Sequence, residues 1–202
     1  MHIAILGTGH VATTLGTALL HAGHHVTFGS RTPDSVSGMP APVLDHAGAI
    51  DGSEVVISAL AAAHSVATLT PLQGSLSGRI LIDVGNAVDE ELNLIYSDSS
   101  LGERLQAALP GTKVVKTLNT VGAVIGVEPD KLSAPTNVFL SGDDPDAKAV
   151  VSEMLDSLGW PPPSQIDLGG IGTARAAEHY FLLFAAVLGA LRTPAFNLAI
   201  VR

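Results

Sequence analysis

The fold is decided near the start of the chain by residues 3–12, which read Ile-Ala-Ile-Leu-Gly-Thr-Gly-His-Val-Ala. An apolar strand pattern leads directly into a turn of the form G-x-G-x-x-A, and a helical pattern follows. In such a turn Gly7 permits a tight bend, Gly9 lets backbone approach a pyrophosphate, and Ala12 allows close helix–strand contact. The helix start offers unpaired N–H groups to phosphate. The stretch therefore predicts a dinucleotide-binding loop.

The end of the second predicted strand indicates which dinucleotide is bound. Sites specific for NAD carry an acidic residue about 20 residues after the glycine turn, where it holds the ribose 2′-hydroxyl. Here residues 27–32 read Thr-Phe-Gly-Ser-Arg-Thr, with no acid. The Arg31 guanidinium can hold a 2′-phosphate, and the Ser30 and Thr32 hydroxyls can cap its remaining oxygens. NADP(H) is therefore favoured over NAD, although Arg31 in a solvated surface loop is the alternative.

Strand-like and helical runs alternate along the chain. Most strand-like runs are continuously apolar, which is typical of parallel strands covered on both faces. The predicted strands are residues 3–6, 25–28, 54–59, 80–84, 113–117, 137–141 and 165–168. The predicted helices are residues 11–22, 43–50, 64–72, 101–109, 145–158 and 173–191. We therefore expect an α/β, Rossmann-type doubly wound, mostly parallel sheet with a C-terminal helical extension.

Two parts of one structural domain are expected: a nucleotide-binding Rossmann domain over residues 1–168, and a helical extension over residues 169–202 packed on it. The final predicted helix is almost wholly apolar after His179. A helix that is apolar all round is buried. We expect it to lie either in the core or in a subunit interface.

Composition excludes several classes of function. The 202 residues are 47% hydrophobic and 14% charged, and contain no cysteine, which excludes disulfides, thiolate metal sites and a cysteine nucleophile. A formal net charge of −9 makes nucleic acid or an anionic membrane an unfavourable partner. No histidine and carboxylate cluster has metal-ligand spacing, so no metal site is expected. The longest apolar run, residues 180–191, is shorter than the ~20 residues of a membrane span, and the chain start lacks a signal-peptide pattern, so we expect a cytoplasmic protein.

No protein acid for catalysis emerges from the sequence. The tyrosine with a lysine four residues later that a short-chain dehydrogenase uses is absent, because Ser100 lies four residues after Tyr96 and Phe184 four residues after Tyr180. Hydroxyacid dehydrogenases of related fold place a catalytic lysine on a helix after the nucleotide domain, but none of the four lysines lies in the C-terminal helix. The catalytic residues are therefore not assigned. His64 could reach the cofactor or be a solvated or helix-capping histidine. Glu178 and His179 could point into an acceptor pocket or be hydrogen-bonded at a dimer interface.

Taken together, these motifs resemble those of the coenzyme F420-dependent NADP oxidoreductase family, over essentially the whole chain. The resemblance includes the glycine loop, the Ser30-Arg31 pair, and two strand ends, Leu-Ile-Asp-Val-Gly-Asn at 81–86 and Val-Lys-Thr-Leu-Asn-Thr at 115–120. It continues through Val-Phe-Leu-Ser-Gly-Asp-Asp at 138–144, Asp-Leu-Gly at 167–169, Thr-Ala-Arg at 173–175 with Glu178, and Thr-Pro-Ala-Phe-Asn at 193–197.

The resemblance implies a cytoplasmic oxidoreductase that moves a hydride between NADPH and a deazaflavin (coenzyme F420) or another flavin-like acceptor. It also implies a homodimer formed through the C-terminal helix. Carried over by position, the pyrophosphate would be lined by Thr8, Gly9, His10 and Val11, and the 2′-phosphate by Ser30, Arg31 and Thr32. Ala59 and Leu60 would flank the adenosine ribose, and the nicotinamide and acceptor would be surrounded by Asn86, Ala87, Asn119, Thr120 and Val121. The alternatives are a non-catalytic NADP(H)-binding sensor or interaction module, and a reductase of a small imine or carbonyl.

Overall fold

A six-stranded parallel sheet forms the centre of the protein, for which the computed structural model describes residues 1–201. The strands are β1 His2–Leu6, β2 His25–Gly29, β3 Val43–Leu44, β4 Val55–Ser58, β5 Ile80–Asp83 and β6 Lys113–Lys116, in the spatial order β3-β2-β1-β4-β5-β6. The direction of winding reverses between β1 and β4. Ligands of such sheets bind beyond the carboxyl ends of the strands at this reversal. The predicted doubly wound fold is confirmed.

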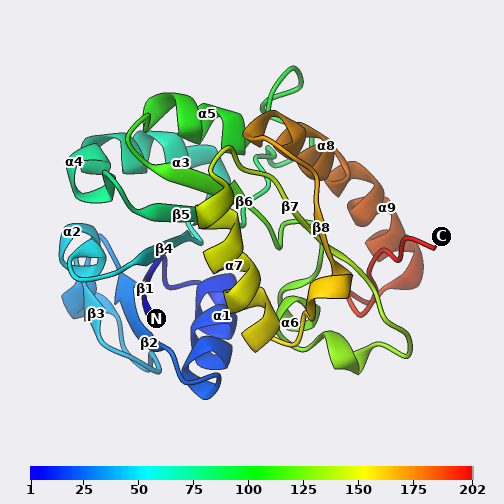
Figure 1. The fold of residues 1–202 in the computed structure, drawn as a ribbon, viewed down its shortest axis with the longest axis horizontal. Coiled ribbons are helices and arrows are strands. Elements are labelled where there is room, and N and C mark those ends of the chain that lie inside the picture. Colours follow the sequence, from blue (N-terminus) through cyan, green and yellow to red (C-terminus); the bar gives the residue numbers. More distant parts are fainter. Residues whose placement is uncertain (202) are drawn as a thin grey trace.

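Helices cover both faces of this sheet (Figure 1). In β1, Ile3 and Ile5 face one apolar layer, whereas Ala4 and Leu6 face the other, as the two-residue period of a strand requires. The first layer contains α1 His10–His21, α6 Ala123–Val127 and α7 Pro145–Ser157. The second contains α2 His46–Ile50, α3 Ala62–Leu69, α4 Gln73–Leu76 and α5 Leu101–Ala108. Single 3₁₀ turns lie at Pro33–Ser35, Thr70–Leu72, Pro129–Lys131, Pro162–Ser164 and Ile171–Thr173.

The last two predicted strands exist but do not extend the main sheet. β7 Val138–Leu140 and β8 Gln165–Asp167 pair in parallel as a separate two-stranded sheet. A single antiparallel bridge between Lys116 and Ser141 joins this pair to the end of β6. The helix between them begins as its sequence predicts, because the Asp144 side chain accepts a hydrogen bond from the Ala147 N–H (2.8 Å) and Pro145 follows the cap.

The prediction of one helix over residues 43–50 is wrong in its first half. Val43 and Leu44 form the short edge strand β3, which pairs with Phe28 and Gly29 of β2. Asp45 then caps the helix, since its side chain accepts a hydrogen bond from the Gly48 N–H (2.6 Å). A capping carboxylate two residues after a β-branched valine marks this boundary, and periodicity alone does not reveal it.

The C-terminal helical segment consists of α8 Ala174–His179 and α9 Phe181–Leu191, which follow one another along one edge of the molecule (Figure 1). No residue of α9 is buried, and Leu182 and Leu183 are 48% and 55% exposed. Burial of this helix in the core, one of the two expectations, is therefore wrong. A helix at the edge contacts the domain on one side only, so its other apolar side remains open.

One helical segment among the described residues, Ile171–Leu191, is long and apolar enough to cross a membrane by length and composition. Its mean hydropathy is 1.3, and 22% of the segment tested is buried. It passes this test although its continuous apolar run is shorter, because the segment also includes α8. The α8 part carries Glu178, which is buried and ion-paired inside the domain. The criterion alone is therefore weak support for a membrane span.

Candidate active site

The glycine turn lies where β1, β2 and β4 end side by side. The Gly7 N–H donates to the Gly29 carbonyl of β2 (2.9 Å). Gly7 has φ +120°, and a Cβ there would lie 2.5 Å from the Ala59 carbonyl oxygen beyond β4. Only glycine fits both the backbone conformation and this close approach. The first glycine of the motif therefore fixes the turn against the neighbouring strand.

The start of α1 is open. Gly9 occupies the N-cap position, no side chain caps the helix, and its first turn carries no acidic residue. A Cβ built on Gly9 meets nothing within 4 Å. The first N–H groups of this 12-residue helix are thus not capped by a side chain, and there is room beside Gly9, which is the arrangement that binds phosphate at a helix N-terminus.

A polar cavity of about 330 Å³ lies on one side of the glycine turn. Arg31 is its charged donor, and the Ser30 hydroxyl accepts a hydrogen bond from the Thr32 N–H (3.2 Å). His46, the first residue of α2, also lines it. The full lining is Gly7, Thr8, Gly9, Gly29, Ser30, Arg31, Thr32, Val36, His46, Ala59, Leu60 and Ala61.

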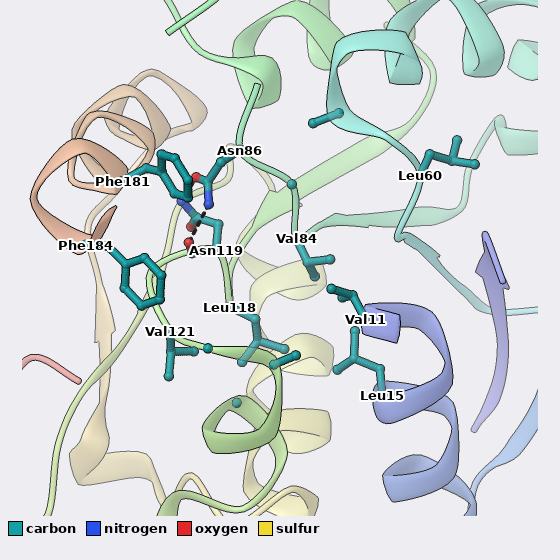
Figure 2. Close-up of a pocket in the computed structure, with 15 residues that line it drawn as sticks. Val11, Leu15, Leu60, Val84, Asn86, Leu118, Asn119, Val121, Phe181 and Phe184 are labelled. Atoms are coloured by element: carbon teal, nitrogen blue, oxygen red, sulfur yellow. Dashed lines mark hydrogen bonds between the residues drawn. The ribbon is translucent and has the colours of Figure 1, made fainter. Parts of the chain in front are cut away.

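An apolar cavity of about 320 Å³ lies on the other side, and Leu60 lines both cavities. Figure 2 shows Val11 and Leu15 of α1 facing it from one side and Phe181 and Phe184 of α9 from the other. Its lining is Val11, Leu15, Leu60, Ala62, Val84, Gly85, Asn86, Leu118, Asn119, Val121, Gly122, Ala123, Gly126, Phe181 and Phe184. None of these residues, all within the described part of the chain, has a titratable side chain.

Two amides supply the polar groups of the apolar cavity. The Asn86 side chain donates to the Asn119 carbonyl (2.7 Å), and the Asn119 side chain donates to Asn86 Oδ1 (2.9 Å), as the dashed lines in Figure 2 mark. Asn119 Nδ2 also donates to the Ala177 carbonyl of α8 (3.1 Å). These bonds lock both side chains. Among the described residues, Asn119 Oδ1 and the second amide hydrogen of Asn86 have no hydrogen-bond partner.

Backbone strain accompanies this arrangement at Leu118, which has φ +59°. A non-glycine residue in the left-handed region costs of order 1 kcal/mol and is maintained by its surroundings. Leu118 follows β6, lines the apolar cavity and precedes Asn119. The turn thus places the Leu118 side chain in the lining of the cavity and the Asn119 side chain in the amide pair.

A buried ion cluster lies next to the strand ends that carry the two asparagines. Lys116 is fully buried, with Nζ 2.8 Å from Asp83 Oδ2 and 2.9 Å from Glu178 Oε1, and it also donates to the Gly85 carbonyl. Glu178 in turn accepts hydrogen bonds from the Leu101 and Gly102 N–H groups (2.8 and 3.0 Å) at the start of α5. Glu178 therefore faces neither the apolar cavity nor a dimer interface, because its carboxylate belongs to the cluster inside the chain and attaches α8 to the sheet.

Most predicted site residues line one of the two cavities, but five do not. Ala12, Ala87 and Thr120 are buried in the protein interior. His10 is exposed and borders a groove between α1 and α6, and His64 is exposed and lines neither cavity. These five residues lie beside the site without facing its cavities.

Several lining residues have no signal in the sequence pattern. Phe181 and Phe184 lie in a helix whose apolar residues predict burial, not a ligand site. His46 lies in the segment predicted as helix throughout, and only the edge strand β3 shows that it reaches the cavity beside Arg31.

Burial and charge affect the His46 imidazole. Burial lowers its pKa, and the Arg31 guanidinium lowers it further, while neighbouring Asp45 opposes both effects. The imidazole is therefore biased towards its neutral form.

The comparisons with known proteins agree with this geometry. The family model described as NADP oxidoreductase, coenzyme F420-dependent, matches residues 2–87. A crystal structure from Arthrobacter sp. FB24, provisionally named an F420-dependent NADP reductase, is 38% identical, with a TM-score of 0.92 and full coverage of both chains. The chain belongs to the F420-dependent NADP oxidoreductase family. By family it is an NADP-dependent oxidoreductase.

Two relatives of this F420-dependent NADP oxidoreductase family member differ in how much of their length the chain covers. The F420-dependent NADP reductase of Methanothermobacter marburgensis is 27% identical over 88% of both chains. The metalloreductase STEAP3 of Rattus norvegicus is 32% identical over 87% of this chain but 35% of its own length. The chain thus spans about a third of the metalloreductase, and the similarity concerns that part alone.

Proposed function

We propose that this protein binds NADPH across the two cavities and transfers its hydride to a deazaflavin such as coenzyme F420, or to another flavin-like ring. The observation that carries the proposal is the contrast across Leu60. A cavity with an arginine and hydroxyl groups meets a cavity lined by apolar and amide side chains, at the switch point of a doubly wound sheet.

The residues on the polar side suit NADP(H). The open start of α1 at Gly9 would hold the diphosphate through backbone N–H groups. Arg31 would pair with the 2′-phosphate, and Ser30 would add a hydroxyl donor. The absence of an acidic side chain among the residues lining this cavity supports NADP(H) over NAD.

The apolar side suits two stacked rings. When bound, NADPH supplies the hydride and a deazaflavin or flavin accepts it. Phe181 and Phe184 would exclude water and hold the rings, and the locked amides of Asn86 and Asn119 would orient them through their remaining donor and acceptor. Positioning is then the principal contribution of the chain.

Reduction of an imine or carbonyl is less well supported, because such enzymes hold a general acid near the reacting atom. None of the residues lining the apolar cavity is such an acid. The metalloreductase relatives suggest a metal ion as a further electron acceptor. Direct hydride transfer to a metal ion is disfavoured, because a hydride carries two electrons, whereas a flavin can take both and pass them on singly.

The open side of α9 supports a homodimer. Leu182, Leu183 and Leu191 are exposed on this helix, while Phe181 and Phe184 line the acceptor cavity, so a second copy would cover the helix close to the site. Sedimentation should show a dimer for the wild-type chain and for Leu92→Lys, a control at another exposed leucine. A monomer is expected for Leu183→Lys, and a monomeric wild-type chain would contradict the proposal.

We propose a cytoplasmic location as well, to be checked by fractionation.

An anaerobic assay tests the proposed reaction. NADPH is mixed with the protein and with coenzyme F420, FMN or FAD, and absorbance of the nicotinamide and acceptor bands is followed. The expected result is NADPH oxidation coupled to reduction of one of these rings, and faster than with NADH. Tight NADPH binding without turnover on any ring, or turnover with a cyclic imine alone, would refute the proposal.

A further inference from the structure

The short edge strand β3 brings a histidine to the polar cavity. The Phe28 N–H donates to the Pro42 carbonyl (2.8 Å), and the Ser30 N–H donates to the Leu44 carbonyl (2.9 Å). These bonds align the carboxyl ends of β2 and β3 at one edge of the sheet. His46 begins α2 directly after the capping residue Asp45 and lines the same cavity as Arg31.

Gly29 makes room for this imidazole. A Cβ at Gly29 would lie 3.0 Å from His46 Nδ1 and 2.6 Å from Leu6 Cδ2. Its φ is not in the left-handed region, so the close approach, and not the backbone conformation, favours glycine here. The last residue of β2 thus permits the imidazole to pack against the strand beside the predicted 2′-phosphate donors.

The imidazole is not satisfied in the free protein. Both ring nitrogens of His46 are buried and have no hydrogen-bond partner among the described residues. A neutral imidazole always carries one N–H, and a buried donor without an acceptor is destabilising. A ligand that brings an acceptor into the cavity would remove this cost, and the adjacent guanidinium of Arg31 indicates that the acceptor is anionic.

We infer that His46 is a further specificity-determining contact for the 2′-phosphate of NADP(H), acting with Arg31, and that it makes the preference for NADPH over NADH rise as pH falls. The inference rests on the proposed function, because it requires NADP(H) to occupy this cavity. It extends that function by assigning a donor whose protonated form the bound phosphate favours.

The direction of the pH dependence follows from the charged groups that face the His46 imidazole. Burial and Arg31 lower the pKa of His46 in the free protein, and Asp45 is the acidic group that opposes them. A bound phosphate dianion favours the imidazolium and therefore raises the pKa. The bound state then holds the proton more tightly, so affinity for the phosphorylated ligand increases as pH falls through the bound-state pKa. The phosphate itself takes up a proton near pH 6, so the comparison belongs between about pH 6.5 and 8.5.

Calorimetry with nucleotide fragments tests this inference. Adenosine 2′,5′-bisphosphate and 5′-AMP are titrated into the wild type, His46→Gln and His21→Gln at both ends of this pH range, in phosphate-free buffer. Glutamine keeps an N–H donor but does not titrate in this range. His21→Gln is the matched control, because His21 is exposed at the end of α1 and lines no part of the polar cavity. Titration of the ligand phosphate is common to all three proteins and cancels between them.

The wild type and His21→Gln should gain about five- to tenfold in preference for the bisphosphate at the lower pH, as expected for one charge-assisted hydrogen bond. His46→Gln should gain less than about twofold. Proton NMR of the His46 ring in the wild type, which needs no variant, should show a higher pKa with the bisphosphate than without it.

Equal pH dependence in His46→Gln and the wild type, or an unchanged His46 titration, would overturn this inference while leaving the NADP(H) site in place. A wild type that prefers the bisphosphate at neither pH would overturn both the inference and the proposed function.

Discussion

The polar and apolar cavities are similar in volume, about 330 and 320 Å³, yet they are built differently. Every residue that lines the polar cavity lies between Gly7 and Ala61, within the 2–87 segment that the family model matches. The apolar cavity also needs the 118–126 segment and two phenylalanines of α9. One cavity is thus a product of the first half of the sheet, and the other exists only when distant segments fold together. The family match therefore bears directly on the cofactor side and less directly on the acceptor.

The largest expected effect removes what attaches α8 to the sheet. Lys116→Met should lower the free energy of unfolding by about 3–5 kcal/mol, because the Asp83 and Glu178 carboxylates lose their buried cation. Urea denaturation measures the loss. Lys113→Met is the control, since its pair with Asp144 is partly exposed and should cost less than about 1 kcal/mol. Equal costs would show that the cluster does not stabilise the acceptor side.

Arg31→Ala should break the polar cavity selectively. We expect NADPH affinity to fall by about 30- to 100-fold, the equivalent of about 2–3 kcal/mol for a charged contact, with NADH affinity changed by less than about twofold. Fluorescence titration with both nucleotides measures this. Equal losses would remove the assignment of Arg31 to the 2′-phosphate.

Gly9→Ala should affect both nucleotides alike. The new methyl group has no clash in the free protein, so stability should change by less than about 1 kcal/mol. The methyl group would occupy the space in which backbone approaches the diphosphate, and we expect about tenfold weaker binding of NADPH and NADH. Thermal unfolding and the same titration separate the two effects. Unchanged affinity would place the diphosphate elsewhere.

Phe184→Ala should have the smallest effect and act on the apolar cavity alone. Phe184 lines that cavity, and its ring centroid lies 4.9 Å from that of Phe196. Loss of one aromatic contact predicts an increase of about threefold to tenfold in KM for the acceptor, and a change of less than about twofold in the Kd of NADPH, whose phosphates bind in the polar cavity. Steady-state kinetics at saturating NADPH measure it. A larger change in NADPH affinity than in acceptor KM would contradict the assignment of Phe184 to the acceptor ring.

The difference between the cavities also explains what the sequence could predict. Residues 3–12 and the alternation of continuous apolar runs with helices predict the sheet, because parallel strands covered on both faces leave that pattern. Gly7, Gly9 and Arg31 lie on or directly after strands near the start of the chain, so their approximate placement follows from strand order alone.

The rest depends on contacts between distant segments. Three features leave no local periodicity: the Lys116–Glu178 pair, the position of Phe181 and Phe184 in the cavity, and the placement of His46 beside Arg31 after the two-residue strand β3. The sequence leaves burial of α9 in the core or in a subunit interface open for a related reason, since an apolar helix at the edge of the molecule has the same pattern as a helix in the core.

The most direct test of the account follows the transferred atom. NADPH carrying deuterium at the reactive position of the nicotinamide is oxidised in ordinary water with coenzyme F420, and the reduced deazaflavin is examined by mass spectrometry, from pH 6 to 9. The account predicts deuterium in the product and a turnover number nearly independent of pH, because no titratable side chain lines the acceptor cavity. Hydrogen from solvent in place of deuterium at the ring carbon that receives the hydride, or a turnover number controlled by one ionisable protein group, would contradict it.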